Sequence, residues 1–161
     1  ERFVPRFPNA TVIAGRREWT AAMNPNERTA AVYIPERLKA IEASGRLQLI
    51  DPDQSGTGTE LFPGIRAVHT GGHSDGHFGL EIESGGQQVW YHADIYPTAA
   101  HLRTPYIPAT DVYPLDTMAL KRALLPRIIE EQVILAFDHD TRLPLAKVVM
   151  AGKQPMALPV D

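Results

Sequence analysis

Hydrophobic and polar positions alternate most regularly in the middle of the chain. Phe78, Leu80 and Ile82 alternate with small or polar residues, glycines follow at 85 and 86, and an apolar segment returns at 89–91. Because alternate side chains of a strand point to the same face, this pattern predicts a β-hairpin over residues 78–91. Short apolar runs at 65–69, 133–137 and 146–150 predict three further strands.

The first third of the chain mixes strand and helix signals. Apolar runs predict strands at 10–14 and 47–50, and residues 17–23 fit one or two helical turns. Residues 35–44 predict a helix, since Pro35 suits a first helical position and Gly45 suits a C-terminal cap. Residues 1–9 and 51–59 are rich in turn-forming residues and are predicted to be loops.

Residues 111–132 have the pattern of a second long helix, which is expected to kink or split at Pro126. The tail from Ala151 contains prolines and polar residues and is expected to be irregular. Helices before and after a β-rich middle indicate an α/β fold in layers, as one domain over residues 1–161.

Composition and charge narrow the functional classes. The 161 residues are 43% hydrophobic with a net charge of −3, which indicates a folded domain rather than disorder. No Lys/Arg block points to nucleic acid or an anionic membrane surface, and no run of 18 apolar residues predicts a membrane span. Because the chain has no cysteine, any metal would be held by histidine and carboxylate groups.

The segment 68–80 contains three of the six histidines. His73 stands at the apex of a loop with glycines at 71, 72 and 76, which allow the backbone to approach an ion closely. Imidazole is the commonest metal ligand in proteins. The alternative is a polar loop whose histidines bond only to backbone groups.

Two further candidates also follow predicted strands. Asp94 comes soon after the apolar residues 89–91, and His139 follows the run 133–137 between two aspartates. The spacings are 21 residues from His73 to Asp94 and 45 from Asp94 to His139. If the strands share a sheet and an orientation, all three side chains reach one rim. The alternatives are a capping aspartate and a loop histidine in an ion pair.

These three motifs, in this order, resemble the later metal motifs of the metallo-β-lactamase superfamily. The matching stretches are GGHSDGH around His73, HADIYP around Asp94 and FDHD around His139. The early segment FPNATVIAGRREW, residues 7–19, is similar to the strand and turn after the first metal motif in a lactonase-like and phosphotriesterase-like branch. The resemblance implies the C-terminal part of a metallo-β-lactamase fold, an αββα sandwich.

The resemblance also implies a dinuclear site. His73 would bind the first ion, His139 the second, and Asp94 would bridge them as the catalytic carboxylate. His77 would support His73, and Tyr96 would contact the substrate. The implied ions are two divalent metals, with Zn²⁺ the default and Mn²⁺ or Fe²⁺ as alternatives. A metal-bound hydroxide would hydrolyse an ester, lactone or phosphoester of a small molecule.

The first motif of the family, H-x-H-x-D-H, is absent, since no two of the six histidines are spaced H-x-H. The chain also begins at Glu1. We therefore expect the C-terminal portion of a larger domain, with an incomplete site, no activity by itself, and self-association into a homo-oligomer through exposed sheet surface. The alternatives are a non-catalytic binding or assembly domain on the same scaffold and a mononuclear His/Asp/His enzyme. The sequence indicates neither the substrate nor the cellular compartment.

Overall fold

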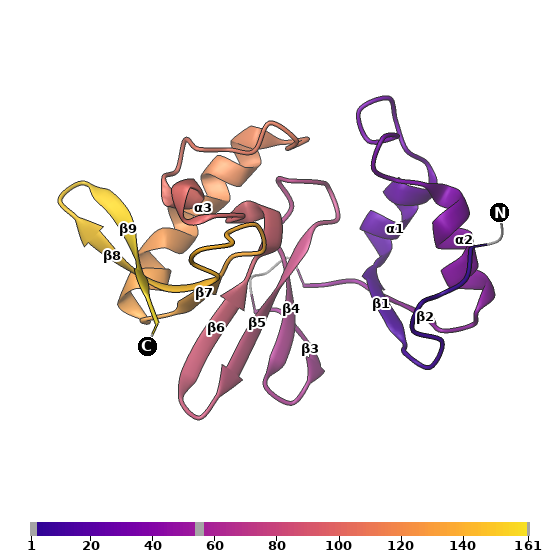
Figure 1. The fold of residues 1–161 in the computed structure, drawn as a ribbon, viewed down its shortest axis with the longest axis horizontal. Helices are drawn as coiled ribbons and strands as arrows, with labels where there is room; N and C mark the ends of the chain where they lie inside the picture. The colour runs from indigo at the N-terminus through magenta and orange to yellow at the C-terminus, as the bar shows by residue number, and fades with distance from the viewer. Residues whose placement is uncertain (1–2, 54–56, 161) are drawn as a thin grey trace. The chain divides into compact units, whose positions relative to one another are not determined.

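A computed structural model describes residues 3–53 and 57–160 of the chain, which forms two compact units (Figure 1). Unit 1 covers Glu1–Asp51 and unit 2 covers Pro52–Asp161. Residues 1–2 and 54–56 of the predicted loops lie outside the described residues.

Unit 1 is a small β-α-α-β arrangement. Strand β1 (Val12–Gly15) pairs in parallel with β2 (Leu47–Ile50), and helices α1 (Arg16–Met23) and α2 (Pro35–Ala43) lie between them in the sequence. Pro35 occupies the first turn of α2, and Gly45 has a φ of +69°, as a residue just after a helix commonly does. These elements confirm the sequence predictions for this region.

Unit 2 is built on one seven-stranded sheet, ordered β3-β4-β5-β6-β7-β8-β9. The strands are β3 (Thr59–Phe62), β4 (Ile65–His69), β5 (Phe78–Ser84), β6 (Gln87–Tyr91), β7 (Ile134–Ala136), β8 (Leu145–Ala151) and β9 (Gln154–Pro159). The predicted hairpin is β5–β6, and Gly85 and Gly86 form its turn with φ of +57° and +76°. Because β4–β5 and β5–β6 are antiparallel and β6–β7 is parallel, β4, β6 and β7 run in the same direction.

Helix α3 (Pro114–Glu130) belongs to the crossover that the parallel pair β6–β7 requires. It packs on one sheet face, where Trp90, Ile128, Val133, Leu135 and Ala146 form part of a buried core. The helix does not split at Pro126, one of the two outcomes predicted for this position, because α3 is one uninterrupted helix. A proline has no N–H, so Pro126 leaves the carbonyl of Arg122 without its helical donor. Both residues lie on the exposed side of α3, where water can bond to that carbonyl. Among the described residues, no helix has the length and apolar character needed to cross a membrane.

Both edges of the sheet differ from the sequence prediction. The tail predicted to be irregular forms β9, which pairs with β8 through a turn at Gly152. Pro155 and Pro159 are tolerated because β9 is an edge strand, where a missing N–H need not break a ladder. The other edge strand, β3, lies in a segment whose sequence predicts no strand.

The sheet face opposite α3 carries a second set of apolar side chains. The strand register places Ile65, Ile82, Val89 and Ile134 in one row across four strands. Exposed apolar residues on the same face are Phe62, Tyr91, Leu145, Met156 and Leu158. The expected self-association rests on this face and stays a prediction.

Candidate metal centre

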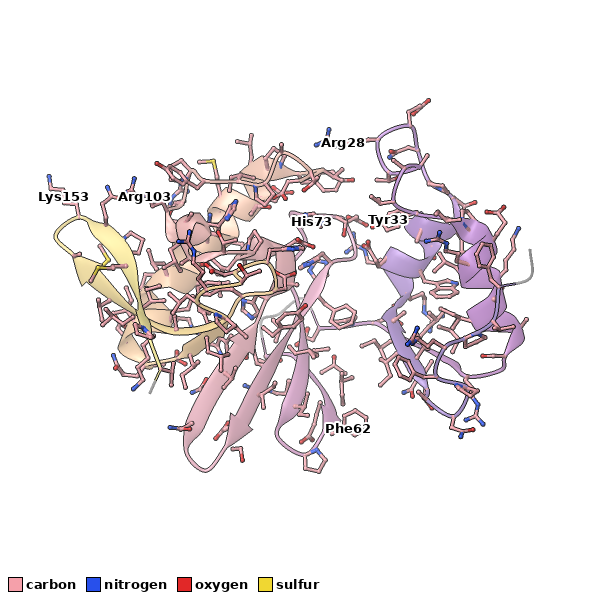
Figure 2. The ribbon with its side chains drawn as sticks, viewed as in Figure 1. Arg28, Tyr33, Phe62, His73, Arg103 and Lys153 are labelled. Carbon is pink, nitrogen blue, oxygen red and sulfur yellow. The ribbon has the colours of Figure 1, made fainter. Side chains whose placement is uncertain are left out.

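The three predicted ligand residues lie beyond the carboxyl ends of three strands of the unit 2 sheet, at the same end of the sheet. His73 is on the loop after β4, Asp94 is in the short helix η1 (Ala93–Ile95) after β6, and His139 follows β7. Figure 2 shows His73 on that loop, past the end of the strands. Strands that run in the same direction deliver the residues after them to one edge, so the shared direction of β4, β6 and β7 brings these side chains together.

The two imidazoles approach different oxygens of one carboxylate. Nε2 of His73 lies 3.6 Å from Oδ2 of Asp94, and Nε2 of His139 lies 3.4 Å from Oδ1 of Asp94. Both distances exceed the upper limit of about 3.2 Å for a good N–H···O hydrogen bond. They are close to the separation of about 3.3 Å between neighbouring ligand atoms around a tetrahedral ion bound at about 2.0–2.1 Å. The separations are therefore long for direct hydrogen bonds and compatible with groups that share a metal ion.

Asp138 is a fourth candidate donor beside these residues, whereas the sequence motif marks it only as a neighbour of His139. Its Oδ2 lies 3.6 Å from Nε2 of His139. Asp94, Asp138 and His139 each place one donor atom within 4.8 Å of the others. Burial, followed by the negative charge of Asp94, raises the pKa of the Asp138 carboxyl. Two carboxylates held this close repel each other, and a cation between them would remove that repulsion.

The segments that carry Asp94 and His139 are tied together by hydrogen bonds from backbone N–H groups. The N–H of His139 donates to the carbonyl of Pro97 at 2.9 Å, and the N–H of Ala99 donates to Oδ2 of Asp140 at 3.1 Å. The bond from Ala99, together with bonds from the backbone N–H groups of Leu143 and Arg142, lowers the pKa of the Asp140 carboxyl. Just before Asp94, Ala93 has a φ of +43°, a left-handed conformation that residues other than glycine seldom adopt. Such backbone strain is common at functional sites.

The His73 loop is closed by bonds at its base. The N–H groups of Thr70 and Gly71 both donate to the carbonyl of His77, each at 3.0 Å. The His77 ring lies edge-on to the His73 ring with centroids 5.5 Å apart, and its Nδ1 contacts the Thr70 hydroxyl. The structure therefore places His77 beside His73, where a supporting role is predicted. That role stays a prediction.

A buried carboxylate that no sequence motif marks lies on the far side of His73. Oδ1 of Asp111 is 2.9 Å from Nδ1 of His73, and the hydroxyl of Thr117 donates to Oδ2 of Asp111 at 2.5 Å. The Asp111 side chain is completely buried. The sequence does place Asp111 shortly before Pro114, and proline is typical of a helix start. It does not show that this helix begins beside His73.

Tyr96, predicted to contact substrate, is only 1% exposed and belongs to the core. Its hydroxyl has no hydrogen-bond partner among the described residues, and burial raises its pKa. A side chain at this depth reaches a substrate only if its surroundings rearrange, and its predicted role remains untested.

Two other histidines have contacts away from the three predicted ligands. His92 is 1% exposed, stacks on Trp90 and lies 3.6 Å from Glu81. Nδ1 of His101 bonds to the Thr98 hydroxyl at 2.8 Å, and burial lowers the pKa of this imidazole. Neither of these contacts involves His73, Asp94 or His139.

No protein-family model and no curated protein matches the chain. Solved structures do match it. A probable metal-dependent hydrolase from Staphylococcus aureus gives a TM-score of 0.82 at 29% identity, over 96% of this chain and 54% of its own. AidC, a dizinc quorum-quenching lactonase, gives 0.79 at 18% identity, over 96% of this chain and 56% of its own. The hydrolase AbOPH of the β-lactamase superfamily gives 0.79 at 19% identity, over 100% of this chain and 58% of its own. The chain thus spans a little over half the length of these proteins.

Proposed function

The chain has the fold of the C-terminal part of metallo-β-lactamase superfamily hydrolases, and from this premise we propose that it supplies part of a metal-dependent hydrolase site. The observation that carries the proposal is the approach of His73 and His139 to separate oxygens of Asp94, at 3.6 and 3.4 Å. The sequence motifs predict the fold, and the structural matches confirm it. The substrates proposed are small-molecule esters, lactones or phosphoesters.

The donor set fits a divalent cation. Two imidazoles and two carboxylates give nitrogen and oxygen ligands that suit Zn²⁺, with Mn²⁺ and Fe²⁺ as alternatives. The two oxygens of Asp94 face different histidines, as expected of a carboxylate that bridges two ion positions. One position would be held by Asp94, His139 and Asp138, and the other by Asp94 and His73.

A bound divalent ion supplies Lewis acidity, which polarises the substrate oxygen and makes water a stronger nucleophile near neutral pH. The residues of this chain contribute position and charge. Asp94 would hold both ion positions, and the bonds of His139 to Pro97 and of Ala99 to Asp140 keep the segments of Asp94 and His139 from separating. The glycine-rich loop and His77 keep His73 at the rim.

We further propose that these residues alone do not complete a dinuclear site. Among the described residues the second position has only His73 and the shared Asp94, whereas a catalytic zinc commonly has three protein ligands. The sequence contains no H-x-H spacing that would add a pair of histidines. The chain by itself is therefore expected to bind metal but to hydrolyse poorly.

The test is calorimetric titration of the metal-free chain with Zn²⁺ and with Mn²⁺, followed by hydrolysis assays with an N-acyl homoserine lactone and a phosphotriester. We expect about one ion per chain and little turnover. Asp94→Asn and His139→Ala should each weaken binding at least about tenfold, because each removes a ligand.

Asp116→Asn is the matched control, since this carboxylate is exposed on the first turn of α3 and lies outside the site. It should bind like the unsubstituted chain. If the chain binds no ion, or if the two ligand substitutions leave binding unchanged, the proposed metal site is wrong. Absence of binding would favour the non-catalytic binding or assembly domain.

A further inference from the structure

Asp111 is the charged partner of His73 on the side away from Asp94. Its Oδ1 lies 2.9 Å from Nδ1 of His73, at hydrogen-bond distance, whereas Nε2 of the same ring faces Asp94 at 3.6 Å. The Asp111 side chain has no exposed surface. A carboxylate is seldom buried this fully unless its oxygens have hydrogen-bond partners. The contacts of Asp111 with its neighbours are therefore what allow it to be buried here.

Thr117 fixes the other oxygen of the carboxylate. Its hydroxyl donates to Oδ2 of Asp111 at 2.5 Å, and the Thr117 side chain is itself buried. Oδ2 of Asp111 thus accepts from Thr117, and Oδ1 lies within hydrogen-bond distance of Nδ1 of His73. An ionised carboxylate has only acceptor atoms, so this arrangement is the one expected for it.

The backbone holds the His73 loop against the start of α3. The N–H of Val112 donates to the carbonyl of His73, and the N–H of Tyr113 donates to the carbonyl of Gly72, both at 2.9 Å. A Cβ atom on Gly72 would overlap the Thr117 hydroxyl oxygen and lie 2.9 Å from the Thr117 backbone nitrogen, so only glycine allows this close approach. Loop, carboxylate and helix therefore form one packed unit.

These contacts determine which ring nitrogen of His73 carries the proton. Because an ionised carboxylate has only acceptor atoms, Nδ1–H of His73 is the donor expected toward Asp111, and in the neutral form of such a ring Nε2 keeps a free electron pair. Nε2 is also the atom that faces Asp94. A hydrogen bond of this kind behind a metal-binding histidine orients the ring and makes it a stronger ligand.

We propose that Asp111, held by Thr117, is a positioning residue that fixes His73 as the Nδ1–H tautomer and aims Nε2 at the ion position next to Asp94. This inference rests on the proposed function for its consequence in metal binding. The tautomer itself is a property of the metal-free chain and is tested without any ion.

The experiment is long-range ¹H–¹⁵N NMR of the metal-free chain, which distinguishes Nδ1–H from Nε2–H rings, with His73→Gln to assign the signals. We expect His73 to be the Nδ1–H tautomer. In Asp111→Asn it should become a mixture of tautomers, and Zn²⁺ affinity measured by calorimetry should fall about 10- to 100-fold. Asp116→Asn, a nearby exposed carboxylate, should change neither result.

Thr117→Val, which keeps the side-chain shape but removes the hydroxyl, is the second variant in case Asp111→Asn does not fold. It should raise the share of the other tautomer while His73 stays in place. A predominant Nε2–H ring in the unsubstituted chain overturns the inference, and so does an unchanged tautomer in every variant that folds. Failure of the proposed function is separate, because the chain would then bind no Zn²⁺ while His73 remained the Nδ1–H tautomer.

Discussion

Nε2 of His139 lies 3.4 Å from Oδ1 of Asp94, although 45 positions separate the two residues in the sequence. The parallel pairing of β6 with β7 produces this approach, because Asp94 and His139 each follow the carboxyl end of one of these strands. Helix α3 lies within the intervening segment and returns the chain to the same edge. The approach of these two residues thus depends on one strand pairing and one crossover.

Asp138 is expected to contribute to metal binding although no sequence motif marks it. Asp138→Asn keeps the size of the side chain and removes a negative oxygen 3.6 Å from Nε2 of His139. Zn²⁺ affinity measured by calorimetry should fall about tenfold. The exposed Asp116→Asn should bind normally, and equal affinities for the two variants would exclude Asp138 as a ligand.

Gly72 is expected to be essential for the packing of the His73 loop on α3. Gly72→Ala meets a positive φ of +72° and an overlap of the added Cβ with the Thr117 hydroxyl oxygen. Together these should lower the free energy of unfolding by about 3 kcal/mol, since the left-handed backbone costs about 1–2 kcal/mol and the overlap adds more.

Gly152→Ala is the matched control for this substitution. Gly152 also has a positive φ, +62°, but nothing lies within 4 Å of an added Cβ. It should lose only about 1 kcal/mol in urea unfolding. Similar losses for the two variants would show that Gly72 does not press against Thr117.

The buried hydroxyl of Tyr96 is expected to destabilise the fold. Tyr96→Phe removes an oxygen that has no hydrogen-bond partner among the described residues. The free energy of unfolding should rise by about 1 kcal/mol, because an unsatisfied buried polar group is costly. If the variant gains no stability, the hydroxyl is no net cost to the fold. A substrate contact by Tyr96, as the sequence resemblance implies, would show separately as lost hydrolytic activity of the assembled site.

Lys121 is expected to make stability increase at alkaline pH. Its side chain is buried, and its ammonium donates to the carbonyls of Arg103 and Tyr106 at 2.8 and 2.7 Å. Burial, opposed in part by the charge of Asp111, lowers the pKa of Lys121 from 10.5 to about 8. Between these values the unfolded chain binds more protons than the folded chain, so the free energy of unfolding should rise with pH.

The measurement is urea unfolding at several pH values from 7 to 11. As pH rises from about 8 to 10.5, the free energy of unfolding of the unsubstituted chain should increase relative to that of Lys121→Met. Above that range the difference between the two should stay constant. A difference that stays constant with pH would mean that Lys121 keeps an ordinary pKa.

Local patterns in the sequence determined much of the secondary structure. Alternation located β5 and β6, short apolar runs located β4, β7 and β8, and Pro35 marked the start of α2. These features depend on neighbouring residues only, because side-chain periodicity and turn chemistry act over a few positions. The motifs around His73, Asp94 and His139 also predicted metal binding, through their resemblance to those of the metallo-β-lactamase superfamily.

Tertiary structure alone decided the features that depend on distant partners. Strand β9 forms at the sheet edge beside β8 despite its prolines, and α3 continues through Pro126 because that side of the helix faces solvent. Asp111 and Asp138 join the site through the packing of α3 and the position of the loop after β7. Distances of this kind follow from strand pairing and burial, which join segments far apart in the sequence, and no local pattern specifies them.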